Sequence, residues 1–202
     1  LLQNMKMGAI AGNTRLRLLG DALGDITGHS MPFRAEQVEQ PAVLTRMVNE
    51  GALPVLGQPV AITGIHRQAI PAVSSNCQNL VLTIEQSGQA PLPDSVFVKL
   101  PMESLLTRWF MNVISSWRLE SHFFRHVASG LPLRTPVTFA TAWQGSRFFL
   151  LQENLRADPD VTRFTNLDMI RGPTLEQARH CLDAFARLHA FHYGMKPDQQ
   201  LR

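Results

Sequence analysis

The chain has 202 residues, of which 45% are hydrophobic and 17% charged, the balance of a globular domain rather than of a disordered or fibrous chain. No window approaches the roughly 18 to 20 uninterrupted apolar residues of a membrane span, so we expect a soluble protein with no membrane partner. The formal net charge is +3, but the arginines are spread along the chain and form no basic run, so nucleic acid is not an expected partner.

The first part of the chain predicts two helices. Residues 1–35 are expected to be an N-terminal extension in which NTRLRLLGDALGDITGH forms one short helix. Pro41 then opens the helix PAVLTRMVNEGAL, which Gly51 ends, because Pro suits the first helical turn and Gly the position just after the last. The chain begins without Met and ends on Gln-Gln-Leu-Arg, so we expect it to be a fragment.

The region after Pro54 predicts β-hairpins. Strand-forming residues fill PVAITGIH, CQNLVLTIEQ and VFVKL, and the turn-like segments QAIPAVSSN and SGQAPLPDS separate them. One long helix is expected over residues 103–128. Two more strands, PVTFATAWQ and RFFLLQEN, follow it and flank the turn Gln144-Gly145-Ser146. The predicted order is therefore three strands, one helix and two strands.

The last predicted element is the helix in PTLEQARHCLDAFARLHAFHY. Thr174 and Gln177 form the T-x-x-Q capping box at its start. Its inner stripe is expected to consist of Leu175, Ala178, Leu182, Phe185 and His189. On this interpretation His189 is a core residue and not a catalytic base.

The remaining histidines and the cysteines give no sign of a metal site. Cys77 and Cys181 form no Cys-x-x-Cys motif. The histidines His66, His122, His126 and His192 have no Cys or carboxylate at the sequence spacing typical of metal ligands. Two distant cysteines also argue against a disulfide framework. We therefore assign no chemistry to these histidines and expect a reducing, cytoplasmic location.

One residue interrupts the apolar pattern of the long helix. Position 120 is Glu, although it belongs to the stripe formed by Leu106, Phe110, Val113, Trp117, Phe124 and Val127. A lone Glu at such a position often bends out to water, since ionised carboxylates are almost never fully buried unless they are paired. The alternative requires a cation nearby.

The strand VFVKL supplies such a cation. Alternation places Phe97 and Lys99 on one face of the strand, with Val96, Val98 and Leu100 on the other. A Lys in this position is also found at sheet edges, where its charge prevents aggregation. If the helix packs back on the sheet, however, Lys99 and Glu120 can meet. Because a buried ion pair contributes little stability, holding a cation for an anionic ligand is the better reason for the pair.

Five segments together resemble a known family. VFVKL is similar to its ATP-binding strand, LESHFFRHVAS to its E-x-x-F-Y-R-x-L-A helix, and RFFLLQENL to its F-L-L-L-E-D-L hinge. LPLRTPVTFAT and LEQARHCLDAFARLHAFHY continue the likeness in the same order. Over about residues 41–193 the chain therefore resembles the kinase-like phosphotransferases of the aminoglycoside phosphotransferase, choline kinase and ecdysteroid-kinase-like type.

The resemblance implies an α+β fold of the protein-kinase type. Residues 36–155 would form an N-lobe, with a five-stranded antiparallel sheet, one long helix and a hinge at residues 152–155. Residues 156–202 would begin a truncated C-lobe, of which the last predicted helix is the first.

The resemblance also implies roles for individual residues. Lys99 would contact the α- and β-phosphates of ATP, and Glu120 would orient it. The phosphate-covering turn would be Ser74, Ser75 and Asn76, although it lacks glycines and an ordinary hairpin turn explains it equally well. The adenine edge would meet backbone groups of Gln152, Glu153, Asn154 and Leu155.

The catalytic residues of the family are not found in the chain. The expected Asp of an H-x-D-x-x-x-x-N loop and the later Asp that holds Mg²⁺ would lie beyond Arg202. ATP and Mg²⁺ are thus the expected cofactors, with metal ligands outside these residues and a small-molecule hydroxyl as acceptor. We expect the full-length protein to be a kinase and this fragment alone to be inactive.

Two other hypotheses stay open. A nucleotide-binding pseudokinase or interaction module would keep the fold and lack phosphate transfer. A purely structural domain would leave Glu120 solvated and would show no binding that depends on Lys99.

Overall fold

The computed structural model describes residues 2–28, 30–70, 76–89, 91–162, 164 and 166–194, without side chains for residues 2–11, 166, 167 and 169. The fold is α+β, with a five-stranded antiparallel sheet in the order β1-β2-β3-β5-β4. The strands are β1 (Ile62–Gln68), β2 (Cys77–Gln86), β3 (Ser95–Pro101), β4 (Thr138–Gln144) and β5 (Arg147–Glu153). The predicted class, strand number and hairpins are confirmed.

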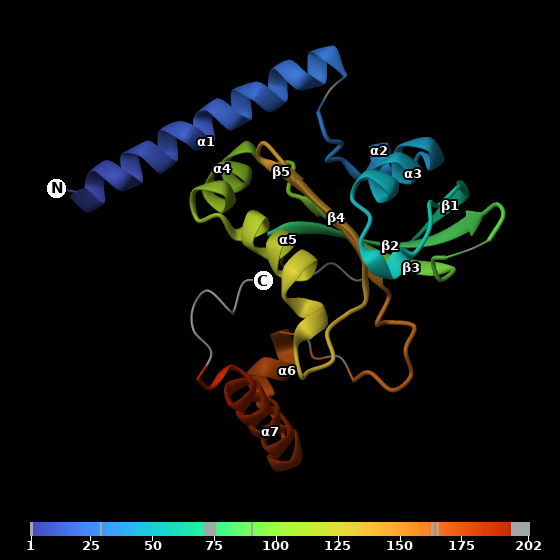
Figure 1. Cartoon of the computed structure of the whole chain (residues 1–202), viewed down its shortest axis with the longest axis vertical. Coiled ribbons are helices and arrows are strands. Elements are labelled where there is room, and N and C mark those ends of the chain that lie inside the picture. Colours follow the sequence, from blue (N-terminus) through green and yellow to red (C-terminus); the bar gives the residue numbers. More distant parts are fainter. Residues whose placement is uncertain are drawn as a thin grey trace.

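The alternation of side chains along the strands divides the core into two layers. Val98 and Leu100 of β3 lie in one apolar cluster with Leu44 and Val48 of α3 (Pro41–Glu50). The second cluster lies on the opposite face of the sheet, where α4 (Leu105–Val113) and α5 (Ser116–His126) pack, and consists of Cys77, Met111, Trp117, Phe148 and Leu150. Figure 1 shows α3 and α5 on either side of the sheet. The short helices α2 (Ala35–Val38), η1 (Pro54–Leu56) and η2 (Ala128–Gly130) lie in the connections.

The long helix predicted over residues 103–128 is wrong, because it is broken into α4 and α5. Ser115 adopts a left-handed conformation with φ +56°, and this residue redirects the chain between the two helices. The predicted stripe is therefore correct only in the second part. Trp117 is 1% exposed, whereas Leu106 is 74% exposed on α4.

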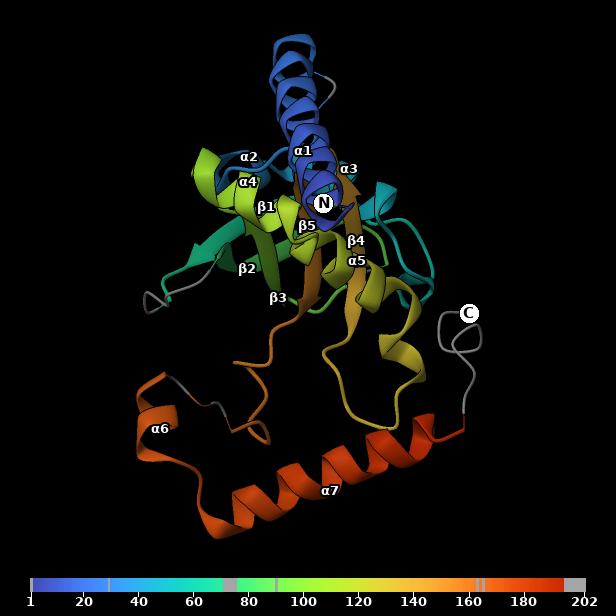
Figure 2. The same cartoon turned by 90° about the vertical axis from the view of Figure 1, so that its left-hand side faces the viewer.

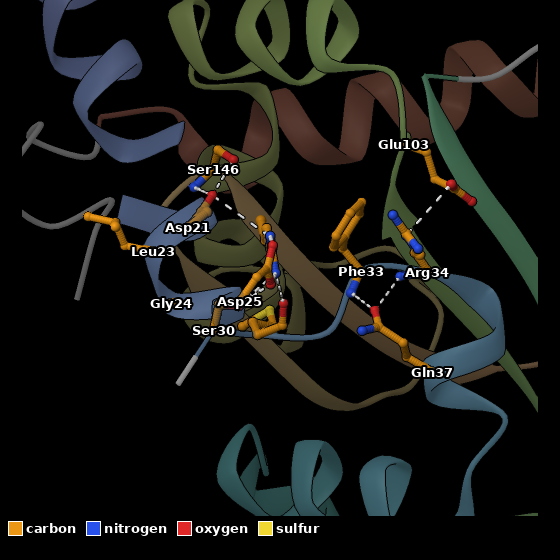
Figure 3. Close-up of polar contacts among 12 residues, drawn as sticks. Asp21, Leu23, Gly24, Asp25, Ser30, Phe33, Arg34, Gln37, Glu103 and Ser146 are labelled. Carbon is orange, nitrogen blue, oxygen red and sulfur yellow. Dashed lines mark hydrogen bonds and ion pairs between the residues drawn. The ribbon is translucent and has the colours of Figure 1, made fainter. Parts of the chain in front are cut away.

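The N-terminal segment forms a longer helix than predicted. Helix α1 (Leu2–Thr27) has 26 residues, and its C-terminal end is tied to the β4–β5 hairpin. The Asp21 carboxylate accepts hydrogen bonds from the backbone N–H and hydroxyl of Ser146, and Figure 3 shows the two side chains pointing toward one another. Gly145 between the strands has φ +59° and lies against Asp21, so a side chain there would be strained and would collide.

Arg147 completes this attachment from the start of β5. It is 1% exposed and donates two hydrogen bonds, at 2.8 and 2.5 Å, to the two carboxylate oxygens of Asp25. Its guanidinium also lies 4.2 Å from the ring centroid of Phe33. The hydrogen bonds from Arg147 hold the pKa of Asp25 below its usual range. We call Asp21, Asp25, Ser146 and Arg147 the N-terminal clamp.

The C-terminal helices lie at the opposite end of the molecule from α1 (Figure 2). They are α6 (Asn166–Arg171), which was not predicted, and α7 (Leu175–His192), whose capping box at Thr174 and Gln177 is confirmed. The predicted burial of the inner stripe of α7 is wrong. No residue of this helix is buried, and His189 is exposed rather than part of the core. The rest of the described chain simply does not cover this face.

The N-terminal clamp predicts a large effect of Arg147→Met on stability. Arg147 Nε also lies 3.8 Å from Oδ2 of the buried Asp21, whereas Asp25 is exposed. Removing the cation leaves the buried Asp21 carboxylate without it, and we expect the free energy of unfolding to fall by about 3 kcal/mol in a urea titration. Arg134→Met is the matched control, because Arg134 also contacts two carboxylates, Glu153 and Asp158, but at an exposed position. Equal effects of the two substitutions would contradict the clamp.

Candidate functional site

The predicted contact between Lys99 and Glu120 is present. Lys99 Nζ lies 2.5 Å from Glu120 Oε1, and the two side chains are 23% and 25% exposed. Strand β3 lies between β2 and β5 in the sheet, so the explanation of Lys99 as an edge-strand charge is wrong. Glu120 is paired rather than free in water. The pair thus joins the middle of the sheet to α5.

Two contacts of α5 place Glu120 at this position. The indole of Trp117 stacks on Phe148 of β5 with ring centroids 5.3 Å apart. One turn later, the buried hydroxyls of Ser121 and Thr141 are hydrogen-bonded at 2.9 Å, which links α5 to β4. Glu120 lies between these two anchors, so the side of the helix that carries it must face the sheet.

Two residues that the sequence interpretation missed lie beside the pair. Asn79 is the register partner of Lys99 across β2 and β3, so both side chains project from the same face. Asn79 Oδ1 is buried and has no hydrogen-bond partner in the part of the chain that the structure describes. The alternation within CQNLVLTIEQ, which separates Asn79 from the apolar Leu80 and Leu82, is the signal that could have identified it.

Cys77 is the second missed residue. It lies in the same apolar cluster as Trp117. Burial raises the pKa of the Cys77 thiol, and the positive charge of Lys99 partly offsets this effect. Cys77 therefore behaves as a packed apolar residue and not as a nucleophile.

The segment predicted as a hinge is held by its own side chains. The Gln152 amide donates to Thr138 Oγ1 at 3.0 Å, and the Asn154 amide donates to Ser95 Oγ at 2.8 Å. Glu153 Oε1 accepts from the backbone N–H of Val137 at 2.9 Å. These three side chains thus fix the end of β5. Because they are already hydrogen-bonded within the protein, the backbone groups of the segment are the ones that could contact a ligand.

A cavity lies against this segment. It has a volume of about 220 Å³ and is lined by Phe97, Pro136 and residues 152–156, among them Leu155. Phe97 projects from the same face of β3 as Lys99, two residues before it, so the cavity and the ion pair are roughly 7 Å apart along the strand. The structure therefore brings together Lys99, Glu120 and the predicted hinge on one face.

The predicted phosphate-covering turn is described only in part. Ser74 and Ser75 lie outside the described residues, and Asn76 is an exposed residue just before β2. Because Asn79 pairs with Lys99, Asn76 lies beyond Lys99 on the side away from the hinge. Its place along the sheet fits a phosphate-covering role, but no contact shows one.

Within the described ranges, no group of three or more His, Cys, Asp or Glu side chains could hold a metal ion. No described helix is both long and apolar enough to cross a bilayer.

Comparisons with models of protein families, with curated proteins and with solved structures found no match for the chain. The resemblance to kinase-like phosphotransferases thus depends on the sequence motifs alone.

The surroundings of Cys77 predict that the two thiols differ in reactivity. Cys181 is exposed on α7, so we expect a disulfide reagent at pH 8 to modify it quickly and Cys77 only after unfolding. Counting released thiolate in native protein and in Cys181→Ser tests this. Rapid modification of native Cys181→Ser would show that Cys77 is accessible and that the apolar cluster is not closed.

Proposed function

We propose that this chain forms the nucleotide-holding part of an ATP-dependent kinase that phosphorylates a small-molecule hydroxyl. One observation carries the proposal. A Lys in the middle of a sheet is paired with a helix Glu, on the same face as a cavity beside the segment at residues 152–156. A partly buried ion pair of this kind does little for stability, whereas an oriented ammonium suits a phosphate.

The dimensions of the site suit a nucleotide that lies along β3. A cavity of about 220 Å³ is smaller than the roughly 300 to 1,000 Å³ of pockets that enclose whole ligands, so it would take only the base. Phe97 would contact the flat face of the base, and backbone groups of Leu155 would meet its edge. The phosphates would then extend toward Lys99, roughly 7 Å along the strand.

Each residue near the phosphates has a separate task in this proposal. Lys99 would neutralise charge on the α- and β-phosphates, and Glu120 would keep the ammonium from swinging away. Asn79, whose buried oxygen has no hydrogen-bond partner among the described residues, would accept a hydrogen bond from the Lys99 ammonium when the nucleotide moves that ammonium toward β2. The kinase-like N-lobe assigned from sequence is part of the same proposal.

The transfer itself would need residues that this chain does not supply. The acceptor hydroxyl oxygen would attack the γ-phosphorus, the bond from that phosphorus to the β,γ-bridging oxygen would break, and ADP would leave while the hydroxyl proton passes to a base. The H-x-D-x-x-x-x-N pattern of that base does not occur among the 202 residues. Mg²⁺ would supply charge neutralisation at the phosphates. The role proposed for this chain is therefore binding and orientation.

Replacing Lys99 tests the proposal. We expect Lys99→Met to weaken binding of Mg²⁺-ATP at least about tenfold, or ~1.4 kcal/mol, in calorimetric titrations. Adenosine should bind both proteins equally, because it lacks the phosphates that Lys99 contacts. Glu120→Gln should weaken ATP binding less, since the ammonium remains and only its orientation is lost.

Arg67→Met is the matched control. Arg67 on β1 forms an ion pair with Glu39 at 3.1 Å, so this change also removes a strand cation from a nearby carboxylate, but on another strand. ATP binding that is unchanged in folded Lys99→Met would defeat the site. ATP binding that depends on Lys99, with no phosphate transfer by the full-length protein, would instead favour a pseudokinase.

A further inference from the structure

A second hollow lies on another side of α5 from Glu120. It has a volume of about 360 Å³, and its lining includes Arg118, His122, Arg125 and His126 of α5 and Trp143 of β4, together with the buried Ser121. Arg118, His122 and Arg125 follow one another at steps of four and three, and His126 lies one turn after His122, so these four side chains share one side of the helix. We call this feature the α5–β4 hollow.

The positive charges of the hollow are not neutralised. Arg125 donates to the backbone carbonyls of Gly51 and Thr141, which fix its guanidinium without cancelling its charge. The Arg118 guanidinium lies 5.7 Å from the ring centroid of Trp143. No Asp or Glu lines the hollow, and no ion pair involves Arg118 or Arg125 within the described ranges.

The helix dipole accounts for only part of this arrangement. Arg125 and His126 lie in the last turn of α5, where the partial negative charge of the helix end favours cations. Arg118 lies in the first turn, where the same dipole disfavours a cation. Its presence there needs another cause, and a bound anion at the hollow would be one.

Two further polar groups belong to residues that line the hollow. The Ser121 hydroxyl is already hydrogen-bonded to Thr141. The indole Nε1 of Trp143 is buried and has no hydrogen-bond partner among the described residues. The exposed side chains of the hollow therefore offer guanidinium and imidazole donors, and what the hollow lacks is a negatively charged acceptor with several oxygens.

We propose that the α5–β4 hollow binds a phosphate group, either free or as the monoester of a small molecule. A phosphate offers three or four strong acceptor oxygens, which suits the donors of two arginines and two histidines on one side of α5 better than the two oxygens of a carboxylate do. His122 and His126, with ring centroids 4.5 Å apart, would each donate one N–H. This site is separate from Lys99 and does not depend on the proposed kinase function.

Substitution of two exposed residues tests the site. We expect Arg118→Gln/His122→Gln to weaken binding of inorganic phosphate and of glycerol phosphate at least about tenfold in calorimetric titrations at low salt. Both side chains are exposed, so the variant should fold. The matched control is Arg179→Gln/His180→Gln, which removes an adjacent exposed Arg and His from α7.

The Trp143 indole N–H gives a local readout. Its NMR signal, assigned with Trp143→Phe, should shift when phosphate is added to wild type and to Lys99→Met, because the hollow does not involve Lys99. Tighter binding of glycerol phosphate than of inorganic phosphate would identify a monoester as the ligand, and the reverse order would identify free phosphate. Absence of phosphate binding, equal binding by Arg118→Gln/His122→Gln, or binding of a single-stranded oligonucleotide alone would overturn the proposal.

Discussion

The packing of Trp117 on Phe148 is the contact on which the arrangement around α5 depends. It buries the largest side chain of that helix against the sheet, and the Ser121–Thr141 hydrogen bond prevents the helix from rotating about this point. Once these two contacts are made, 3.6 residues per turn decide where the other side chains go. Glu120 must face Lys99, and Arg118 and His122 must face away from it.

The composition of the sheet face beneath α5 shows a compromise between packing and polarity. Cys77, Phe148 and Leu150 would pack well against a wholly apolar helix, yet Lys99, Asn79 and Glu120 occupy neighbouring positions. Lys99 and Glu120 each keep about a quarter of their surface in water, so their desolvation is limited and their attraction is screened. An apolar residue at each position would pack at least as well. The stability of the fold therefore does not by itself explain the polar residues at these positions.

The sequence predicts those parts of the molecule whose signals are local. Alternation in CQNLVLTIEQ and VFVKL located β2 and β3, and Thr174 with Gln177 located the start of α7. The Lys99–Glu120 contact was also predicted, because a Glu in an apolar helix stripe and a Lys in an apolar strand can each neutralise the charge of the other. The helix break was not predicted, since Ser is not a residue type that favours φ +56° and so gives no local signal for a break at position 115.

Long-range contacts explain the other errors of prediction. The attachment of α1 to the sheet was not predicted, because it is made where Asp21 and Asp25 meet Ser146 and Arg147, more than 120 positions later. No local pattern in NTRLRLLGDALGDITGH indicates such a partner. The apolar stripe of α7 was predicted to be buried and is not. Amphipathic spacing identifies a helix face that can be covered, but it does not identify the segment that covers it.

The β4–β5 hairpin couples the two ends of this arrangement. Ser146 and Arg147 hold the acidic end of α1, while the Trp143 ring centroid, four residues earlier, lies 4.9 Å from the guanidinium of Arg17 on α1 and 5.7 Å from that of Arg118 on α5. This one hairpin therefore contacts both helices, so the position of α1 relative to α5 depends on how the hairpin packs.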